Sequence, residues 1–354
     1  MDRVTGKVDF NVDLIRALAI VLVIMLHAAI EPHPIVTQIN QAEVFRWWSV
    51  DIYDSLAQPC VPLFVLLSGA LLLQPSKTDE PMGVFFKKRL NRIALPFLFW
   101  GIAYFAWSYL IDNEPFTFGS ILQGIQTGPY YHFWFLYMIV GLYLITPVLR
   151  VLVSHSDRRL LRYSLIVWFV GTAIVPLIGL FDNTIVDNKV FLPVGWVGYF
   201  ILGAYLLKVQ LKPIILYISL FTAFVWTAAG TYFMTLNVGG TNSYFFFNEL
   251  GANIILASVS IFLLLRSISP INLENHVPRF NWLIHKIGQN TLPIYLFHVM
   301  VLESLQRGYL GFTISVNTLN PAFEVPLITV VTLFICLGVI CLLKKVPVLN
   351  RLIG

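Results

Sequence analysis

The sequence predicts an all-α membrane protein, a bundle of about ten transmembrane helices that forms one membrane-embedded domain over residues 1–354. Of its 354 residues, 58% are hydrophobic and only 12% are charged, whereas soluble domains carry roughly 25% charged residues. The mean hydropathy is +0.78. Apolar stretches long enough to cross a bilayer follow one another along the chain. The polar stretches between them are too short to form a soluble domain of useful size.

Ten apolar stretches are expected to be transmembrane spans, each defined to within about 3 residues at its ends. They cover approximately 12–30, 52–73, 92–111, 133–151, 161–181, 190–207, 213–235, 249–268, 291–310 and 323–343. We interpret the first stretch as an uncleaved span, because it lacks a clear cleavage site. The mixed amphipathic pattern of residues 279–289 predicts a short helix on the membrane surface.

The basic residues support this span count and orient it. With the N-terminus in the cytoplasm, 20 of the 23 Lys and Arg residues fall in cytoplasmic segments, as the positive-inside rule requires. The sequence therefore predicts that both termini are cytoplasmic. The net charge of +5 reflects these loops and does not indicate nucleic-acid binding. The three cysteines lie in apolar runs without metal-ligand spacing, so we expect neither a metal site nor a disulfide framework.

Two ionisable residues in the first span point to a functional site. Arg16 and His27 are eleven residues apart, which is about 20° from three full helical turns, so they share one helix face about 16 Å apart along the axis. Glu31 lies one turn beyond His27 and is placed to hold the imidazole and raise its basicity. The alternatives are a snorkelling Arg16 paired with Asp13 and a histidine buried for structural reasons.

Four further motifs join the R-x10-H pattern of the first span in a fixed order along the chain. They are "VPLFVLLSGALL" (61–72), "FFKKRLNRIALPFLFW" (85–100), "YHFWFLYMIVGLYLITPVLR" (131–150) and "TLPIYLFH" (291–298). Together they resemble the acyltransferase-3 family of integral-membrane O-acyltransferases, specifically its glycan O-acetylating branch. The resemblance covers essentially the whole chain and includes the number of spans.

The resemblance implies roles for the basic residues at the cytoplasmic side. His27 would be the general base that activates an acceptor hydroxyl. Arg89 and Arg92 are three residues apart on one helix face and, with Arg16, would bind the phosphates of coenzyme A. The alternative for the basic cluster is a topology signal alone. No Gly-rich phosphate loop is present, so side chains would have to bind the donor.

Candidate acceptor residues lie on the outer side of the predicted bundle. The segment "GPYYHFWFLY" (128–137) contains His132, Trp134 and Tyr137, which could form a platform for a sugar or a belt at the membrane interface. Glu249 opens the eighth span from the outside. His298 is seven residues into the ninth span, a depth that predicts no direct contact with His27. For His298, a structural hydrogen bond and a role in the donor channel both stay open.

The resemblance thus implies a multi-pass O-acetyltransferase of a bacterial inner membrane. It would move acetyl from cytoplasmic acetyl-CoA to a hydroxyl of a cell-envelope glycan or lipid-linked sugar. One alternative is a transporter or flippase of an acyl donor or glycolipid, although the repeated halves frequent in transporters are not found. Another is the same fold transferring succinyl or a longer acyl group. The expected partners are acyl-CoA, the acceptor and membrane lipid. Whether the protein forms a homo-oligomer, and whether an acyl-enzyme forms, are questions that the sequence leaves open.

Overall fold

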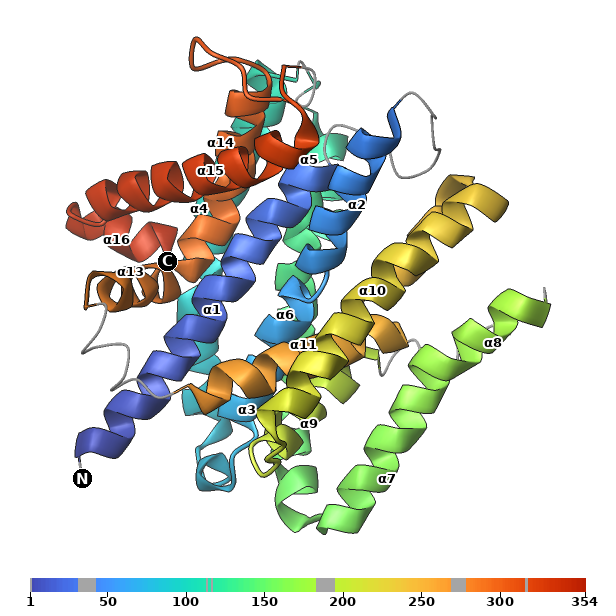
Figure 1. Ribbon diagram of the computed structural model, residues 1–354. Helices are drawn as coiled ribbons and strands as arrows, with labels where there is room; N and C mark the ends of the chain where they lie inside the picture. Colours follow the sequence, from blue (N-terminus) through green and yellow to red (C-terminus); the bar gives the residue numbers. More distant parts are fainter. Residues whose placement is uncertain are drawn as a thin grey trace.

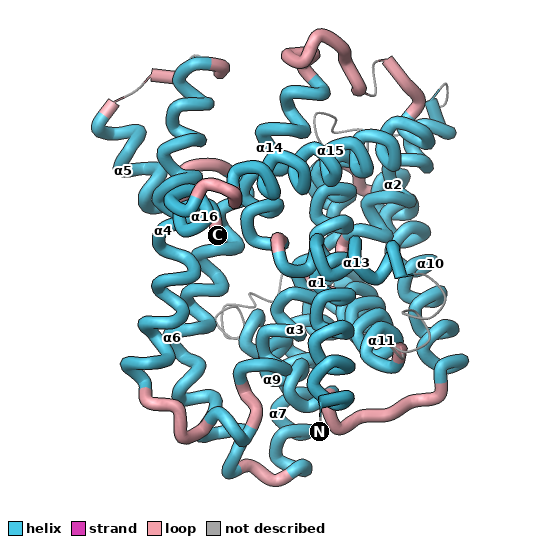
Figure 2. Tube along the Cα trace, turned by 90° about the vertical axis from the view of Figure 1, so that its left-hand side faces the viewer, coloured by secondary structure: helices cyan, strands magenta, loops and turns pink. Residues whose placement is uncertain are grey.

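The computed structural model describes residues 2–30, 43–112, 114–115, 117–182, 195–268, 278–315 and 318–354. These ranges are predominantly helical and contain no β-strand. The long helix α1 crosses the middle of the bundle (Figures 1 and 2) and packs against α2, α3, α11, α13, α14 and α15. The all-α prediction is therefore confirmed for the described residues.

The helices of more than one turn have the following bounds: α1 (Asp2–Ile30), α2 (Val44–Ala57), α3 (Cys60–Leu72), α4 (Met82–Leu110), α5 (Phe118–Thr127), α6 (Trp134–His155), α7 (Arg158–Phe169), α8 (Val175–Asp182), α9 (Gly195–Leu206), α10 (Pro213–Asn237), η8 (Gly240–Phe247), α11 (Ala252–Ser267), α13 (Pro278–Gln289), α14 (Thr291–Gln306), α15 (Pro321–Leu343) and α16 (Pro347–Ile353). A short 3-10 turn, η4 (Tyr131–Phe133), precedes α6, and a π-helical turn, η5 (Val170–Ile174), joins α7 to α8.

Every predicted span overlaps a helix in its described residues. Eight helical stretches in the described ranges are long and apolar enough to cross a membrane. The other two, α9 with 12 residues and α14 with 16, are shorter than the roughly 20 residues of a full span. Helix α13 forms where an amphipathic helix was predicted and packs against α1. The sequence did not predict α5, which starts at a capping box between Thr117 and Ser120.

Successive connections lie at opposite ends of the bundle. The turns that join α3 to α4, α6 to α7 and α9 to α10 lie at the lower end in Figure 1, near the N-terminus. The connections from α4 to α5 and from α14 to α15 lie at the upper end (Figures 1 and 2). This alternation matches the predicted order of cytoplasmic and outer connections.

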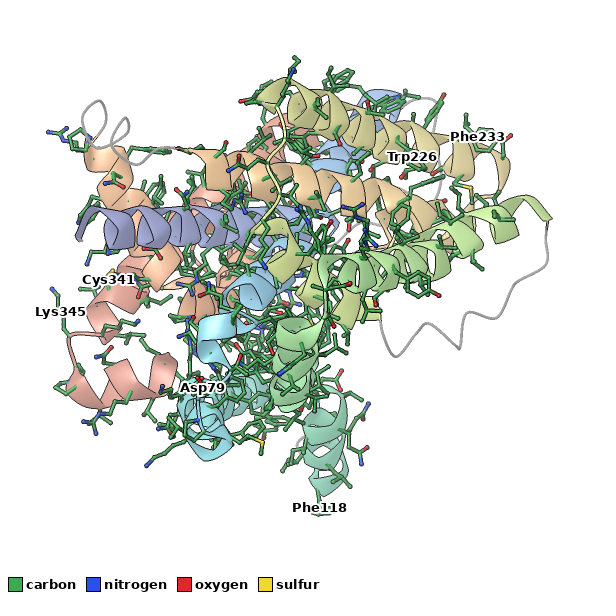
Figure 3. All side chains as sticks on the ribbon, turned by 90° about the horizontal axis from the view of Figure 1, so that it is seen from below. Asp79, Phe118, Trp226, Phe233, Cys341 and Lys345 are labelled. Atoms are coloured by element: carbon green, nitrogen blue, oxygen red, sulfur yellow. The ribbon has the colours of Figure 1, made fainter. Side chains whose placement is uncertain are left out.

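Apolar side chains cover much of the outward surface. Phe118 of α5 is 82% exposed and Phe233 of α10 is 58% exposed, and both project away from the bundle (Figure 3). Exposed apolar residues at this density would be a liability in water but are favourable in contact with lipid tails. The chain is accordingly a multi-pass membrane protein.

Two glycines bring α3 and α9 into close contact. A Cβ atom added to Gly69 would lie 1.8 Å from the carbonyl oxygen of Phe200, and one added to Gly203 would lie 1.9 Å from that of Leu66. Neither position has room for a methyl group, so the two backbones touch directly, as small residues allow in membrane helix pairs. Gly69 directly follows Ser68 of the S-G motif. The motif therefore places α3 tightly against its neighbour beside the candidate site.

Candidate active site

A pair of histidines lies at the centre of the candidate site. The Nδ1 atom of His27, in α1, is 2.7 Å from Nε2 of His298, in α14. The two rings stack with centroids 5.0 Å apart and planes inclined by 20°. His298 is fully buried and His27 is partly buried. The long first helix and the short ninth predicted span thus contribute one imidazole each to a single contact.

The hydrogen bonds assign a tautomer to each ring. The Nδ1 atom of His298 lies 2.6 Å from the carbonyl oxygen of Tyr295, which can only accept a hydrogen bond, so His298 carries its proton on Nδ1. Its Nε2 atom is then an acceptor. Nδ1–H of His27 must donate to it, which leaves Nε2 of His27 with a free lone pair. An imidazole in this state is suited to take a proton from a hydroxyl.

The contact corrects the prediction that His298 lies too deep to meet His27. That prediction measured the depth of each residue from the start of its own apolar run. In the structure α14 begins beside α1 and not at the boundary of the bundle, because α13 packs against α1 with Gly288 over Asp13. Thr291, the first residue of α14, lines the same cavity as Arg16. This inward start and the reach of the two side chains bring the imidazoles together.

An aromatic turn covers the histidine pair. The ring of Tyr131 meets His27 edge to face at 5.5 Å, and the ring of His132 meets His298 at 5.5 Å. The hydroxyl of Tyr295 donates to the carbonyl oxygen of His132 and so holds the turn in place. The His132 side chain is 1% exposed, and neither of its ring nitrogens has a hydrogen-bond partner. The turn η4 therefore brings a third, unpaired imidazole next to the pair.

The same turn is anchored from its other side. The hydroxyl of Tyr130 donates to Glu303 in α14, at 2.5 Å. The indole N–H of Trp107 donates to the second oxygen of the same carboxylate, at 2.9 Å. With both oxygens bonded, Glu303 fixes η4 relative to α14, and it also approaches Arg307 at 3.6 Å. Sequence analysis did not identify this residue.

A small cavity extends from the bundle centre toward the predicted cytoplasmic side. Its volume is about 120 Å³, and its lining includes Arg16, Arg92, Ser68, Tyr143 and Tyr295. Arg16 pairs with Asp13 at 3.6 Å, as the sequence suggested. Tyr295 contributes its ring to the cavity and its carbonyl oxygen to His298. The cavity therefore connects two guanidinium groups with the backbone that orients the histidine pair.

Arg89 lies one turn from Arg92 but does not line this cavity. Its guanidinium group lies 5.3 Å from the ring of Phe85 and 5.6 Å from the ring of Tyr143. Because Tyr143 also lines the cavity, Arg89 contacts the site through an aromatic ring. The three arginines predicted to bind phosphates are thus divided, with two at the cavity and one stacked beside it.

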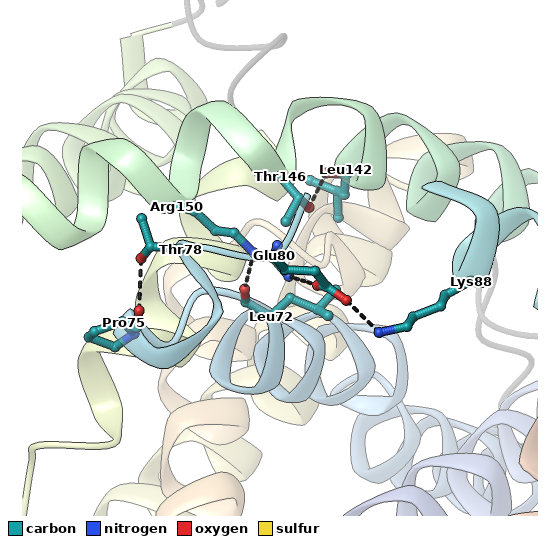
Figure 4. A network of polar contacts seen from close by, with 8 residues as sticks. All are labelled: Leu72, Pro75, Thr78, Glu80, Lys88, Leu142, Thr146 and Arg150. Atoms are coloured by element: carbon teal, nitrogen blue, oxygen red, sulfur yellow. Dashed lines mark hydrogen bonds and ion pairs between the residues drawn. The ribbon is translucent and has the colours of Figure 1, made fainter. Parts of the chain in front are cut away.

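A polar network stabilises the connection that leads into α4 (Figure 4). The buried Arg150 side chain donates from Nε to the carbonyl oxygen of Leu72, at 2.8 Å, and pairs with Glu80 at 3.1 Å. Lys88 donates to the other oxygen of Glu80, at 2.7 Å. The hydrogen bond from Lys88 and the neighbouring Arg150 hold the pKa of Glu80 below its usual value. The network ties α3 and α6 to the helix that carries Arg89 and Arg92.

The remaining predicted acceptor residues do not gather around His27. Trp134 is 39% exposed and its ring lies 5.9 Å from that of Trp196. The hydroxyl of Tyr137 donates to the carbonyl oxygen of Ile125 in α5, at 2.6 Å. Glu249 accepts a hydrogen bond at its backbone carbonyl from Tyr199. Glu31 lies outside the described residues.

Comparisons with known proteins agree with the sequence motifs. A family model described as an acyltransferase domain, that of the acyltransferase-3 family, matches residues 9–341. No curated protein and no solved structure matches the chain. Within the described ranges, no three His, Cys, Asp or Glu side chains are arranged to hold a metal ion.

Proposed function

The chain belongs to the acyltransferase-3 family, and from this we propose that it transfers acetyl from cytoplasmic acetyl-CoA to a hydroxyl of an envelope glycan or lipid-linked sugar, in a bacterial inner membrane. It is a membrane acyltransferase. The single observation that carries the proposed chemistry is the 2.7 Å contact between Nδ1 of His27 and Nε2 of His298.

The proposed proton transfer follows from the tautomers. The free Nε2 of His27 takes the proton of the acceptor hydroxyl as its oxygen attacks the thioester carbonyl carbon. While it carries this proton, the imidazolium of His27 keeps its hydrogen bond to Nε2 of His298. The C–S bond then breaks, the acyl group stays on the acceptor oxygen, and the leaving thiolate takes the proton back from His27, which returns the imidazole to its neutral state. His298 is therefore a positioning residue, and the orienting role expected of Glu31 stays a prediction.

The donor would bind from the cavity side. Arg16 and Arg92 present two guanidinium groups there, and guanidinium groups bind phosphates through paired hydrogen bonds. Arg16 and His27 are about 16 Å apart along α1, a distance suited to an extended pantetheine arm.

Replacing His27 tests the proposal. His27→Gln keeps a hydrogen bond but cannot take a proton, so acetyl transfer should fall at least ~100-fold. Transfer is measured as thiol release from acetyl-CoA and as acetylated glycan by mass spectrometry. His155→Gln, at an exposed histidine near the end of α6, is the matched control and should retain full activity.

Binding of acetyl-CoA to purified His27→Gln separates loss of chemistry from loss of structure. The proposal expects binding close to that of the unmodified protein. If His27→Gln transfers acetyl at the normal rate, His27 is a structural histidine and the assigned chemistry is wrong.

A further inference from the structure

Helix α2 carries buried acidic and aromatic residues that the proposed reaction does not use. We call the following set the α2 cluster: Asp51, Asp54, Trp47 and Trp48 of α2, Tyr232 of α10 and Tyr244 of η8. Helix α2 packs against α10 as well as against α1 and α15 (Figures 1 and 2). The cluster therefore lies between three parts of the chain that are distant in sequence.

The carboxylates of the α2 cluster are almost without protein partners. Asp51 and Asp54 are both 0% exposed. Neither oxygen of Asp51 has a hydrogen-bond partner, and Asp54 has only Gln58, on one oxygen at 2.6 Å. No Lys, Arg or His of the described ranges forms an ion pair with either residue. Buried carboxylates normally need a counter-charge and hydrogen bonds, so this pair lacks what usually stabilises it.

Two further buried polar groups also lack partners, one within the α2 cluster and one next to Tyr244 in the sequence. Trp47 is 1% exposed and its indole N–H is unpaired; it stands four residues before Asp51, on the same helix face. Ser243 is 0% exposed, and its hydroxyl is unpaired as well. The next residue, Tyr244, interacts electrostatically with Asp54. Buried hydrogen-bond donors and acceptors that lack protein partners in one region indicate a ligand that bonds to them.

Aromatic rings complete the cluster. Trp48 stacks on Tyr232 with centroids 4.8 Å apart, and Trp47 meets the same ring edge to face at 5.5 Å. Trp48, Tyr232 and Tyr244 are partly exposed, so the cluster has an accessible side. Aromatic faces beside carboxylates favour an organic cation, because the ring quadrupole attracts an ammonium group that the carboxylates neutralise.

Other occupants fit less well. Protons alone would neutralise the carboxylates, but they would leave the indole N–H of Trp47 and the hydroxyl of Ser243 without partners. A metal ion would need more ligands, and no three carboxylate, imidazole or thiolate groups of the described residues are arranged for one. We propose that the α2 cluster binds an organic ammonium group, carried by a soluble amine or by a lipid headgroup.

Binding to purified full-length protein in detergent tests the proposal without any acetyl transfer. The probes are ethanolamine, choline and glucosamine, with N-acetylglucosamine and sodium chloride as controls that lack the ammonium group. Ligands that bind only the folded state raise the unfolding temperature in a saturable way. The three ammonium probes should do so, and the two controls should not.

Variants locate the binding. Asp51→Asn and Asp54→Asn should weaken the response at least ~10-fold. Glu324→Gln is the matched control, because Glu324 of α15 is also 0% exposed with both oxygens unpaired but is not a member of the α2 cluster. Its response should equal that of the unmodified protein. If the aspartate variants fail to fold, Trp48→Leu, at a partly exposed ring, should still weaken binding about 2–30-fold.

Nanodiscs distinguish the source of the ammonium group. If the protein is more stable in phosphatidylethanolamine nanodiscs than in phosphatidylglycerol nanodiscs, and Trp48→Leu loses this difference, the ammonium group belongs to a lipid headgroup. If the protein responds only to the free amines, the ammonium group belongs to a soluble ligand. The proposal is overturned if neither free amines nor phosphatidylethanolamine stabilise the protein. It is equally overturned if N-acetylglucosamine acts as well as glucosamine, or if Trp48→Leu responds like the unmodified protein.

Discussion

The Nδ1 atom of His27 and the Nε2 atom of His298 lie 2.7 Å apart, although 271 residues separate them in the chain. The contact joins α1 to α14 beneath the aromatic turn η4. Because Tyr295 fixes the proton of His298 on Nδ1, the pair has only one neutral arrangement in which both hydrogen bonds are made. The effect of this histidine contact on the rate of acetyl transfer and on acetyl-CoA binding can be measured directly.

Replacing His298 should lower the rate without weakening substrate binding. His298→Phe keeps a ring but removes the acceptor for Nδ1–H of His27, so kcat should fall about 10–150-fold while KM for acetyl-CoA stays the same. His298→Gln retains an acceptor oxygen and should recover part of the loss. Steady-state kinetics of the three proteins check this. A His298→Phe variant with unchanged kcat would show that the contact is structural only.

The arginines of the cavity should act on the donor. Arg16→Ala or Arg92→Ala should raise KM for acetyl-CoA about 10–100-fold, because each removes charged hydrogen bonds to phosphate. Lys87→Ala is the control, since Lys87 is exposed at the same cytoplasmic mouth but does not line the cavity. If Lys87→Ala and Arg92→Ala raised KM for acetyl-CoA equally, Arg92 would act only through its positive charge and not through hydrogen bonds to phosphate. The same conclusion would follow if Arg92→Lys bound acetyl-CoA as tightly as the unmodified protein.

The network around Glu80 should make stability depend on pH in acid. The pKa of Glu80 is lower in the folded protein than its ordinary value of 4.5. The ionised carboxylate therefore stabilises the fold fully above pH 4.5, and this contribution is lost as the pH falls below it through the folded pKa.

Thermal unfolding of the unmodified protein and Glu80→Gln measures this contribution. The difference between their unfolding temperatures should be largest near neutral pH and should shrink below pH 4.5. Arg150→Ala should destabilise by about 1–3 kcal/mol, because it leaves the carbonyl oxygen of Leu72 without its donor and Glu80 with Lys88 as its only partner in the network. A pH-independent difference between the unmodified protein and Glu80→Gln would contradict the assigned ion pairs.

The close contact of α3 and α9 should not tolerate a methyl group. Gly69→Ala and Gly203→Ala place a Cβ atom within 2 Å of a backbone oxygen, so each should cost about 1–3 kcal/mol or more. Gly141→Ala in α6 and Gly338→Ala in α15 are matched controls, since nothing lies within 4 Å of the added atom. They should be neutral or slightly stabilising, because alanine favours helix. Unfolding temperatures in detergent compare the four variants.

Local sequence features determined much of this protein. Long apolar runs specify membrane helices, because a bilayer leaves the backbone no partner except itself. All ten predicted spans contain helix in their described residues, and the placement of Arg16 and His27 on one helix face follows from helical geometry alone. Arg16, Arg92 and His27 were therefore recognisable as candidate site residues before their surroundings were known.

Intramembrane carboxylates gave a signal that our sequence analysis did not use. Asp51 and Asp54 stand three residues apart beside an apolar run, a spacing that puts both on one helix face. Ionisable residues in a span are costly and usually functional. That Gln58 is their one hydrogen-bond partner among the described residues, however, depends on every neighbouring helix and could not have been deduced from the spacing.

The tertiary structure alone decided which groups meet. Sequence gives the depth of a residue only along its own helix, and the offset between two helices depends on where each one starts in the bundle. Helix α14 starts beside α1, with Thr291 and Arg16 lining one cavity, and this offset brings His298 to His27. In the same way, Arg89 and Arg92 share one helix face. In the structure Arg92 lines the cavity, whereas Arg89 stacks on Tyr143 beside it. Helical periodicity is a local property of the backbone, whereas the alignment of helices results from side-chain packing over the whole bundle.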